Sequence, residues 1–410
     1  MGNITEHVVI VGAGHAGGSA AALLRQYRWP GAVTLIGAES VVPYQRPPLS
    51  KAWLKGEQKI ADLLLRPAAF YPANGIDLRL GCEVTAIDRA SGCVALADGE
   101  HVPYDHLIVA TGCHARALPL PGHQLEGIAA LRTLADADRL RPWLHAGTRI
   151  AIIGAGYIGL EVAASARSRG AEVVVIEREA RVLPRVASAP LSAFFQQRHV
   201  AAGVRILTGA GVEAFEGRNG RVAAVRLSDG ESVACDAVLA GIGAAPNDAL
   251  AGAAGLACDN GIRVDLAART SDPAIHAIGD CTHRPMPLYQ RTCRLESVPN
   301  ALEQAKQAAA DLCRRPPPPP EVPWFWSDQY DLRLQIAGLP FDVAETVVRG
   351  DPASGSFALF HLAQDGTVQT VEAVNAPAEF MAGRMMIGRR RRVVASRLAD
   401  VSCSIRELAG

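Results

Sequence analysis

Two copies of one Gly-rich motif constrain this chain more than any other feature of its sequence. They are Gly12-Ala-Gly14-His-Ala16-Gly17 and Gly154-Ala-Gly156-Tyr157-Ile158-Gly159. Each follows an apolar run that predicts a buried strand, residues 7–11 and 149–153, and precedes an Ala-rich stretch that predicts a helix. In this pattern the first Gly permits a tight turn, the second lets backbone approach a pyrophosphate, and the third lets helix pack on strand. Two copies in this context predict two bound dinucleotides, and therefore electron transfer between them.

The bulk composition fits a multidomain α/β protein. The 410 residues exceed one typical core, and 49% of them are hydrophobic and 20% charged. The formal net charge is zero, so no global field favours nucleic acid or a membrane. No apolar run reaches transmembrane length, and the N-terminus leads directly into a strand. We therefore expect no signal peptide, no membrane association and a cytoplasmic location, in which the nine cysteines are mostly reduced.

The strand–Gly–helix unit is followed in both halves by short strands with turn signals, which predicts an internal duplication. These strands fall in residues 76–110 and 204–240, whereas residues 298–313 predict a helix. Two arginines and five prolines at residues 314–320 predict a stiff linker, and residues 331–374 predict further strands. The predicted fold class is α/β, with two Rossmann-like dinucleotide-binding domains and a C-terminal α+β domain. The expected domains are residues 1–115 with 245–320, residues 116–244, and residues 321–410.

Several further motifs occur in an order and spacing that resemble one superfamily. They are Arg46-Pro-Pro-Leu-Ser-Lys51, Ala110-Thr111-Gly112, Gly241-Ile-Gly243-Ala-Ala-Pro-Asn247, Ile278-Gly-Asp280-Cys281, Glu296-Ser-Val298-Pro-Asn-Ala-Leu-Glu-Gln304 and Trp324-Phe-Trp326-Ser-Asp-Gln329. With the Gly-rich motifs, they resemble the pyridine nucleotide–disulfide oxidoreductases, and within these the FAD-dependent ferredoxin reductases of the putidaredoxin reductase type. The resemblance covers residues 7 to about 375. It implies a glutathione-reductase-like fold, with FAD in the first domain and NADH in the second.

The resemblance assigns one set of residues to FAD. Gly12, Gly14 and Ala16 lie at the pyrophosphate, and Gly17 completes this FAD-binding motif. Glu39 replaces, one residue late, the acid that usually binds the adenosine ribose. Asp280 matches the aspartate at the ribityl chain, and Val298 begins a helix whose N-terminus faces N1 and O2 of the flavin ring. The other implied FAD contacts are Arg46, Lys51, Val84, Thr111, Gly112, Arg132 and Trp326.

Three of these residues have structural alternatives. Glu39 is alternatively a solvated loop carboxylate, and Asp280 a helix N-cap. Val84 is alternatively a core residue of a strand, and it can be both.

Lys51 and Glu161 are the residues that we expect at the reacting centre. In the family this lysine lies beside the flavin N5, where its charge stabilises electron density on the reduced ring. Glu161 closes the second Gly-rich motif, and in related flavoenzymes this glutamate pairs with that lysine. The alternative for Lys51 is a solvated side chain, the usual state of a lysine.

The second Gly-rich motif is implied to bind NADH through Gly154, Gly156, Tyr157, Ile158 and Gly159. Glu177 follows the next predicted strand, where a carboxylate accepts from the ribose 2′-OH and repels a 2′-phosphate, so NADH is preferred over NADPH. Arg178 and Arg181 lie nearby and can accept a phosphate, which leaves the strictness of this preference open. Gly243 allows close approach to the nicotinamide, or is only a turn glycine.

The cysteine pattern selects the reaction. No two cysteines are spaced Cys-x-x-Cys or closer, and residues 43–51 contain none, so no thiol relay is expected. The flavin is then expected to pass single electrons to a [2Fe–2S] ferredoxin that feeds a cytochrome P450 or a ring-hydroxylating dioxygenase. The alternatives are an NADH oxidase or peroxide reductase, a rubredoxin reductase, and a non-enzymatic flavoprotein that resembles apoptosis-inducing factor.

Ferredoxins are acidic, so a basic docking surface is expected on a monomer or weak dimer. Its candidate residues are Arg66, Arg291, Arg294, Arg314 and Arg315. The run from Arg389 to Arg392 could contribute, but a solvated basic helix face is the favoured interpretation. Trp326 either shields the flavin, lies between flavin and acceptor, or packs in a core.

Overall fold

The computed structural model describes residues 6–410, which divide into two compact units. The first unit contains residues 6–45, 60–114 and 245–323, and the second contains residues 46–59, 115–244 and 324–410. The C-terminal residues therefore cluster with the second unit. The predicted boundaries of three separate domains stay a prediction.

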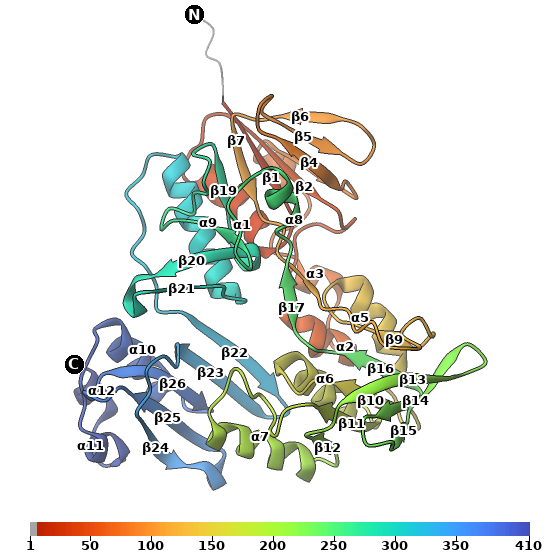
Figure 1. The fold of residues 1–410 in the computed structure, drawn as a ribbon. Coiled ribbons are helices and arrows are strands. Elements are labelled where there is room, and N and C mark those ends of the chain that lie inside the picture. Colours follow the sequence, from red (N-terminus) through yellow and green to blue (C-terminus); the bar gives the residue numbers. More distant parts are fainter. Residues whose placement is uncertain (1–5) are drawn as a thin grey trace, which may run out of the picture. The chain divides into compact units, whose positions relative to one another are not determined.

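A parallel five-stranded sheet in the order β19-β7-β1-β2-β3 is the centre of the first unit (Figure 1). Its strands are β1 (His7–Val11), β2 (Ala32–Gly37), β3 (Ile76–Leu80), β7 (His106–Val109) and β19 (Ile275–Ala277). Val8 and Ile10 of β1 belong to the core formed with helices α1 (His15–Gln26) and α9 (Val298–Leu312). Val9 and Val11 belong to a second core with the meander β4 (Val84–Asp88), β5 (Cys93–Leu96) and β6 (His101–Pro103). This alternation is why an unbroken apolar run forms a strand that is buried on both faces.

The remaining elements of the first unit are short. They are α3 (Ile60–Leu63), α4 (Phe70–Ala73), α8 (Ala249–Ala253), β18 (Ile262–Arg263), η3 (Gly279–Cys281), β20 (Thr282–Met286), η4 (Pro287–Tyr289) and β21 (Arg291–Cys293). Strands β8 (Cys113–Ala115) and β17 (Ala244–Pro246) lie where the chain passes from one unit to the other. Residues 315–323, which contain the proline run, form neither helix nor strand.

The second unit repeats the plan of the first, which agrees with the predicted duplication. Its parallel sheet has the order β12-β11-β10-β16-β9. The strands are β9 (Ile128–Ala129), β10 (Arg149–Ile153), β11 (Glu172–Glu177), β12 (Arg205–Thr208) and β16 (Ala237–Ala240), with the meander β13 (Val212–Arg218), β14 (Arg221–Leu227) and β15 (Ser232–Ala234). The helical elements are η1 (Pro47–Ser50), α2 (Ala52–Lys55), α5 (Leu134–Leu140), η2 (Arg141–Trp143), α6 (Tyr157–Ser168) and α7 (Ala189–Ala201).

The second unit also contains an antiparallel sheet in the order β22-β23-β26-β25-β24 (Figure 1, blue). Its strands are β22 (Trp324–Gln329), β23 (Leu332–Gly338), β24 (Glu345–Asp351), β25 (Ser356–Leu362) and β26 (Val368–Val374), with η5 (Pro352–Ser354) between β24 and β25. Helix α10 (Pro377–Gly388) packs on β23 and β26, and α11 (Ala395–Ala399) and α12 (Ile405–Ala409) follow. These elements confirm the α+β character predicted for the C-terminal part.

One prediction about this end of the chain is wrong. Arg389–Arg392 does not lie on a helix face, because α10 ends at Gly388 and Arg390 adopts a left-handed conformation (φ 51°) that stops the helix. The run instead turns back until Arg392 bridges Thr367, and its four residues remain exposed. No helix within residues 6–410 is long and apolar enough to cross a membrane.

Candidate functional site

Both Gly-rich turns have the same close-packed geometry. Gly12 (φ +113°) and Gly154 (φ +97°) adopt conformations that L-residues rarely reach, and a Cβ on either would lie 2.2 or 2.4 Å from a backbone carbonyl oxygen. A Cβ on Gly17 would lie 1.9 Å from the oxygen of Gly12, and one on Gly159 2.2 Å from the oxygen of Gly154. Only glycine therefore allows each helix to begin directly against the end of its strand.

The helix N-termini at these turns are suited to bind pyrophosphates. Gly14 and Gly156 are the N-cap residues of α1 and α6, and as glycines they have no side chain that could cap the helix. Backbone N–H groups at such a helix terminus can bind an anion, and the helix dipole favours negative charge there. A Cβ on Gly156 or on Gly243 would meet nothing within 4 Å, so both glycines border open space. The second turn thus fits a dinucleotide, and its neighbours Tyr157 and Ile158 open α6.

An acidic residue lies at the end of the second strand of each parallel sheet or just after it. Glu39 follows β2 and accepts a hydrogen bond of 2.6 Å from the Tyr44 hydroxyl. Glu177 ends β11, is 9% exposed and accepts from the backbone N–H of Ala155, inside the second Gly-rich motif, at 2.7 Å. A carboxylate oxygen has two lone pairs, so each acid can still accept from a ribose hydroxyl.

The arginines near Glu177 have other partners. The guanidinium of Arg181 donates to the carbonyl oxygens of Ala187 and Pro184, each at 2.9 Å. Arg178 pairs with Glu179 at 3.1 Å and is highly exposed. Arg181 therefore helps to hold its own loop, which weakens the case for a phosphate-binding arginine here.

A buried ion pair lies next to the second Gly-rich motif. Lys51, between η1 and α2, places its Nζ 2.7 Å from Oε2 of Glu161, whose side chain on α6 is 3% exposed. Hydroxyls of Ser50 and Ser327 donate to the two oxygens of Glu161 at 2.5 and 2.6 Å. Lys51 itself is only 17% exposed, so it is not an ordinary solvated lysine. The sequence motif indicated the pair but contained no signal for the contact with Ser327.

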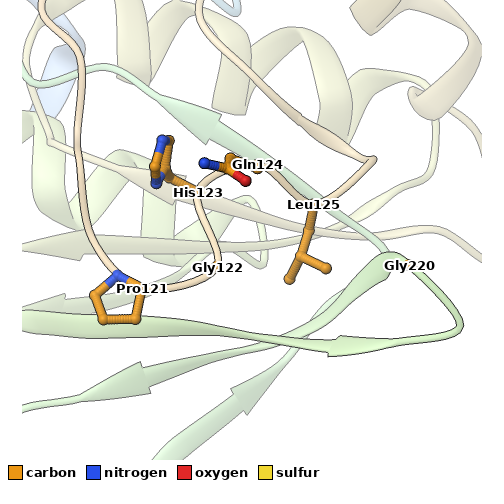
Figure 2. Close-up of a pocket in the computed structure, with 6 residues that line it drawn as sticks. All are labelled: Pro121, Gly122, His123, Gln124, Leu125 and Gly220. Atoms are coloured by element: carbon orange, nitrogen blue, oxygen red, sulfur yellow. The ribbon is translucent and has the colours of Figure 1, made fainter.

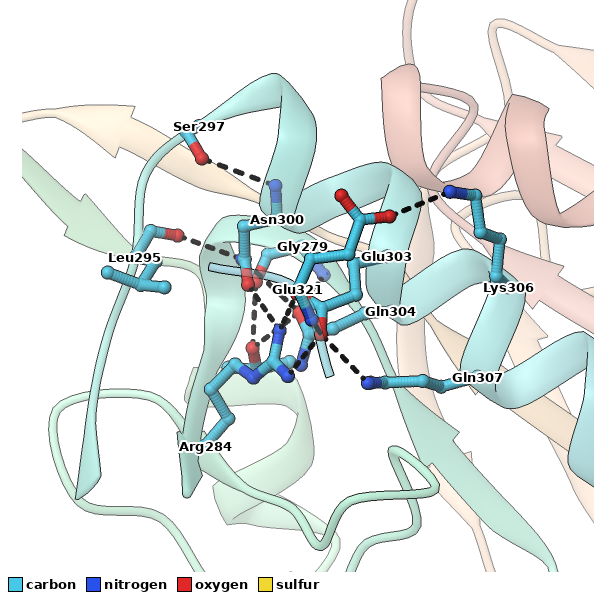
Figure 3. A network of polar contacts seen from close by, with 11 residues as sticks. Gly279, Arg284, Leu295, Ser297, Asn300, Glu303, Gln304, Lys306, Gln307 and Glu321 are labelled. Carbon is cyan, nitrogen blue, oxygen red and sulfur yellow. Dashed lines mark hydrogen bonds and ion pairs between the residues drawn. The ribbon is translucent and has the colours of Figure 1, made fainter. Parts of the chain in front are cut away.

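In the first unit, a buried polar network holds the start of α9 (Figure 3). Arg284, which is 2% exposed, pairs with Glu303 at 2.9 Å and donates to Asn300 at 2.8 Å. The side-chain oxygen of Gln304 accepts from the N–H of Gly279 at 2.8 Å, which ties α9 to the turn that carries Asp280. Because Val298 is the first residue of α9, this network sets the positions of both Val298 and Asp280.

Val298 opens helix α9 as predicted, whereas Asp280 is not the N-cap of a helix. Ser297 is the N-cap of α9 and accepts from the N–H of Asn300, so Val298 opens the helix as expected. Asp280 lies within η3, whose N-cap is Ile278, and accepts from the Cys113 thiol at 3.4 Å. The alternative interpretation of Asp280 as an N-cap is therefore wrong.

The other predicted FAD residues are distributed over both units. Thr111 and Asn247 exchange two hydrogen bonds of 2.7 and 2.8 Å, and Gly112 beside them has a φ of +67°. Val84 is half-buried against the meander core of the first unit, as its structural alternative requires. In the second unit, Arg46 donates to the carbonyl oxygen of Arg132 at 2.7 Å.

The aromatic residues at the start of β22 pack on two different helices, α10 and α6. The rings of Trp324 and Trp326 lie 5.6 Å apart, and Trp324 packs on Phe380 of α10. Phe325 instead packs on Tyr157 of α6, with ring centroids 4.9 Å apart. Alternate residues of a strand point to opposite faces, so the face of β22 that carries Ser327 is the one turned toward α6.

All nine cysteines are free thiols. Cys281, directly after Asp280, is completely buried, and burial raises the pKa of its thiol. A buried thiol with a raised pKa is a poor nucleophile, so Cys281 is not suited to a thiol relay.

One surface hollow lies in the second unit (Figure 2). Its lining consists of Pro121, Gly122, His123, Gln124, Leu125 and Gly220. None of these residues is a carboxylate or a lysine, and Nδ1 of His123 already contacts the carbonyl oxygen of Leu120. The two Gly-rich turns and the Lys51–Glu161 pair remain the candidate site.

Two Gly-rich turns with helix N-termini suited to pyrophosphates indicate a protein that binds two dinucleotides. The sequence pattern described as pyridine nucleotide-disulphide oxidoreductase matches residues 6–305, and that described as reductase C-terminal matches residues 324–409. The chain therefore belongs to the pyridine nucleotide-disulphide oxidoreductase family. It is an FAD-dependent oxidoreductase that uses NAD(P)H, and it has the additional C-terminal reductase domain.

Individual proteins agree with this membership over the whole chain. The probable ferredoxin reductase CtmF of Castellaniella defragrans is 52% identical over 99% of this chain and 100% of its own length. Putidaredoxin reductase CamA of Pseudomonas putida is 44% identical over 99% of this chain and 97% of its own. A crystal structure of the covalent putidaredoxin reductase–putidaredoxin complex matches with a TM-score of 0.96 at 44% identity, over 99% of this chain and 98% of that one.

Two of the three glycines of the second motif, Gly156 and Gly159, predict different effects of one added methyl group. Gly159→Ala forces a Cβ against a carbonyl oxygen and should lower the free energy of unfolding by about 1–3 kcal/mol. In Gly156→Ala the added methyl group points into open space at a φ of −76°, so the variant should keep wild-type stability. The same methyl group should obstruct the pyrophosphate and raise the NADH dissociation constant roughly tenfold or more. Urea unfolding and titration of NADH onto the oxidised protein measure these effects. Equal destabilisation by both changes would contradict the geometry.

Proposed function

We propose that this chain is a cytoplasmic NADH-dependent reductase that passes electrons through FAD, one at a time, to a [2Fe–2S] ferredoxin. That ferredoxin would serve a cytochrome P450 or a ring-hydroxylating dioxygenase. The observation that carries the proposal is the buried Lys51–Glu161 pair beside a dinucleotide-binding turn, in a chain whose cysteines are all unpaired. The names of the similar proteins, a probable ferredoxin reductase and a putidaredoxin reductase, support ferredoxin as the acceptor.

Bound FAD supplies the conversion of a two-electron donor into single-electron transfers. The residues of this chain bind, orient and stabilise charge. The uncapped N-termini of α1 and α6 hold the two pyrophosphates, with Glu39 and Glu177 at the adenosine riboses. Lys51, in the role that the family resemblance gives it, places a positive charge at the flavin N5, and Glu161 holds its ammonium in place. The network of Figure 3 fixes the N-terminus of α9, which we propose faces N1 and O2 of the flavin.

NADH is preferred because of the charge and position of Glu177. Its carboxylate is held by backbone N–H groups of Ala155 and Glu179, so it cannot easily rotate away from a 2′-phosphate. Arg181 is engaged with its own loop, and Arg178 has Glu179 as a neighbour. A 2′-phosphate would therefore lie next to the Glu177 carboxylate, which would repel it.

Removing the negative charge of Glu177 should weaken the preference for NADH over NADPH. In Glu177→Gln the amide oxygen still accepts from Ala155, whereas the negative charge and the hydrogen bond from the N–H of Glu179 are lost. We expect the ratio of kcat/KM for NADH to that for NADPH to fall roughly tenfold, or about 1.4 kcal/mol. Glu172→Gln is the matched control, since this exposed glutamate begins β11, at the opposite end of the strand from Glu177, and should leave the ratio unchanged. An unaltered ratio in Glu177→Gln would remove Glu177 from the specificity determinants.

Ferredoxin dependence is the direct test of the function. NADH-driven reduction of cytochrome c by the purified flavoprotein should be slow alone and strongly stimulated by a suitable [2Fe–2S] ferredoxin. Rapid NADH consumption in air without any carrier would instead favour an oxidase or peroxide reductase. Stimulation by rubredoxin alone would identify a rubredoxin reductase, and a long-lived charge-transfer complex without turnover would point to a non-enzymatic role.

Lys51→Met should slow NADH-driven flavin reduction by at least about tenfold, because a positive charge at the site of developing negative charge is lost. Stopped-flow absorbance of the flavin follows this step without any ferredoxin. Lys55→Met is the control, since this lysine ends α2, the short helix that follows Lys51, and its ammonium pairs with the exposed Glu57. Unchanged hydride-transfer kinetics in Lys51→Met would defeat the assignment of Lys51.

A further inference from the structure

The Lys51–Glu161 pair is the end of a longer buried hydrogen-bond chain in the second unit. Oε1 of Glu161 accepts from the Ser327 hydroxyl at 2.6 Å, and Ser327 in turn accepts from Nε2 of Gln329 at 3.1 Å. Oε1 of Gln329 lies 2.8 Å from Nε2 of His199. Nδ1 of His199 lies 3.0 Å from the hydroxyl of Tyr330. Ser327, Gln329 and His199 are each no more than 1% exposed.

Three separate elements bring these side chains together. Glu161 lies on α6, His199 on α7, and Ser327 and Gln329 on β22 of the antiparallel sheet. Ser327 and Gln329 are two residues apart on one strand, so they share the face that carries Phe325 onto Tyr157. The C-terminal domain thus supplies the partner of one oxygen of Glu161, whereas Lys51 and Ser50 occupy the other oxygen.

The donors of the hydrogen-bond chain all point toward the carboxylate. The amide nitrogen of Gln329 faces Ser327, so its oxygen faces His199 and requires a proton on Nε2 of the imidazole. The neutral ring then accepts at Nδ1 from the Tyr330 hydroxyl. Burial lowers the pKa of His199, which agrees with a neutral ring. Hydrogen bonds aligned in one direction polarise one another and stabilise the negative charge at their end.

We infer that Ser327, Gln329 and His199 are positioning residues for Lys51. They fix the orientation of the Glu161 carboxylate, and through it the place of the Lys51 ammonium during flavin reduction. The C-terminal domain therefore contributes to the reaction with NADH. The inference rests on the role proposed for Lys51 above.

Gln329→Met tests the inference, because it preserves side-chain length and removes both hydrogen bonds in the middle of the chain. We expect NADH-driven flavin reduction to slow about fivefold, the effect of losing one net hydrogen bond. The midpoint potential of the flavin, measured by spectroelectrochemistry, should become more negative, since a misplaced cation stabilises the reduced ring less. Ser327→Ala should act in the same direction and is a minimal change that keeps the packing if Gln329→Met folds poorly.

Two comparisons separate this role from simple stabilisation of the fold. In a Lys51→Met background, Gln329→Met should cause no further slowing, because its effect passes through Lys51. Arg349→Met is the control for lost stability of the C-terminal sheet. Arg349 is 5% exposed and donates to the carbonyl oxygens of Leu398, Asp400 and Cys403 from β24, the opposite edge strand to β22. This variant should melt at a lower temperature but keep the wild-type flavin potential and reduction rate.

Each contrary result has a distinct meaning. If Gln329→Met and Ser327→Ala melt at lower temperature but keep the wild-type rate and potential, the hydrogen-bond chain is only structural and the inference is wrong. It is also wrong if Gln329→Met slows the reaction equally with lysine or methionine at position 51. If Lys51→Met itself behaves as wild type, the proposed role of Lys51 fails, and the inference fails with it. If Lys51→Met alone is slow, the role of Lys51 stands and only the inference is lost.

Discussion

The contact between helix and strand at each Gly-rich turn is the constraint on which the rest of this molecule depends. Where Gly17 and Gly159 pass within van der Waals contact of the turn that precedes them, no side chain fits. The helix can then begin directly at the strand end, and its first N–H groups remain without a side-chain cap. A pyrophosphate is the partner that completes such a helix terminus, so the packing requirement and the binding function have one structural cause.

The two units use this shared plan in different ways. In the first, α9 packs beside α1, and a buried network around Arg284 and Glu303 ties its N-terminus to the turn at Asp280. In the second, α6 is covered instead by β22 of the antiparallel sheet, which brings Ser327 to Glu161. The duplication thus provides two nucleotide-binding turns, and the elements added to each copy give the copies different tasks.

Both units contain a buried ion pair, and neither pair is explained by stability. Removing two charges from water costs several kcal/mol per ion, and well-packed apolar residues often stabilise a fold as well or better. Arg284–Glu303 and Lys51–Glu161 instead have additional hydrogen bonds, which make a buried charge more tolerable. What such pairs provide is a defined position: one holds a helix N-terminus, and the other holds an ammonium group.

The sequence by itself determined the local features of this protein. The apolar runs of β1, β10 and β16, the glycines that begin α1 and α6, and the helix at Val298 were all predicted correctly, because each depends on neighbouring residues. The family resemblance added the pairing of Lys51 with Glu161, which local patterns do not contain. The prediction for Arg389–Arg392 was wrong because α10 ends at Gly388. Arg390 then adopts a left-handed conformation, which the arginine run itself does not indicate.

Only the tertiary structure decided which distant side chains meet. Ser327 is 166 positions from Glu161, and Gln329 is 130 positions from His199, so no periodicity or motif links them. Ser, Gln and His in a strand and a helix resemble ordinary polar residues until packing removes water from all of them at once. A buried polar group must then find a partner inside the protein, and that requirement, which acts across three elements, creates the hydrogen-bond chain that ends at Glu161.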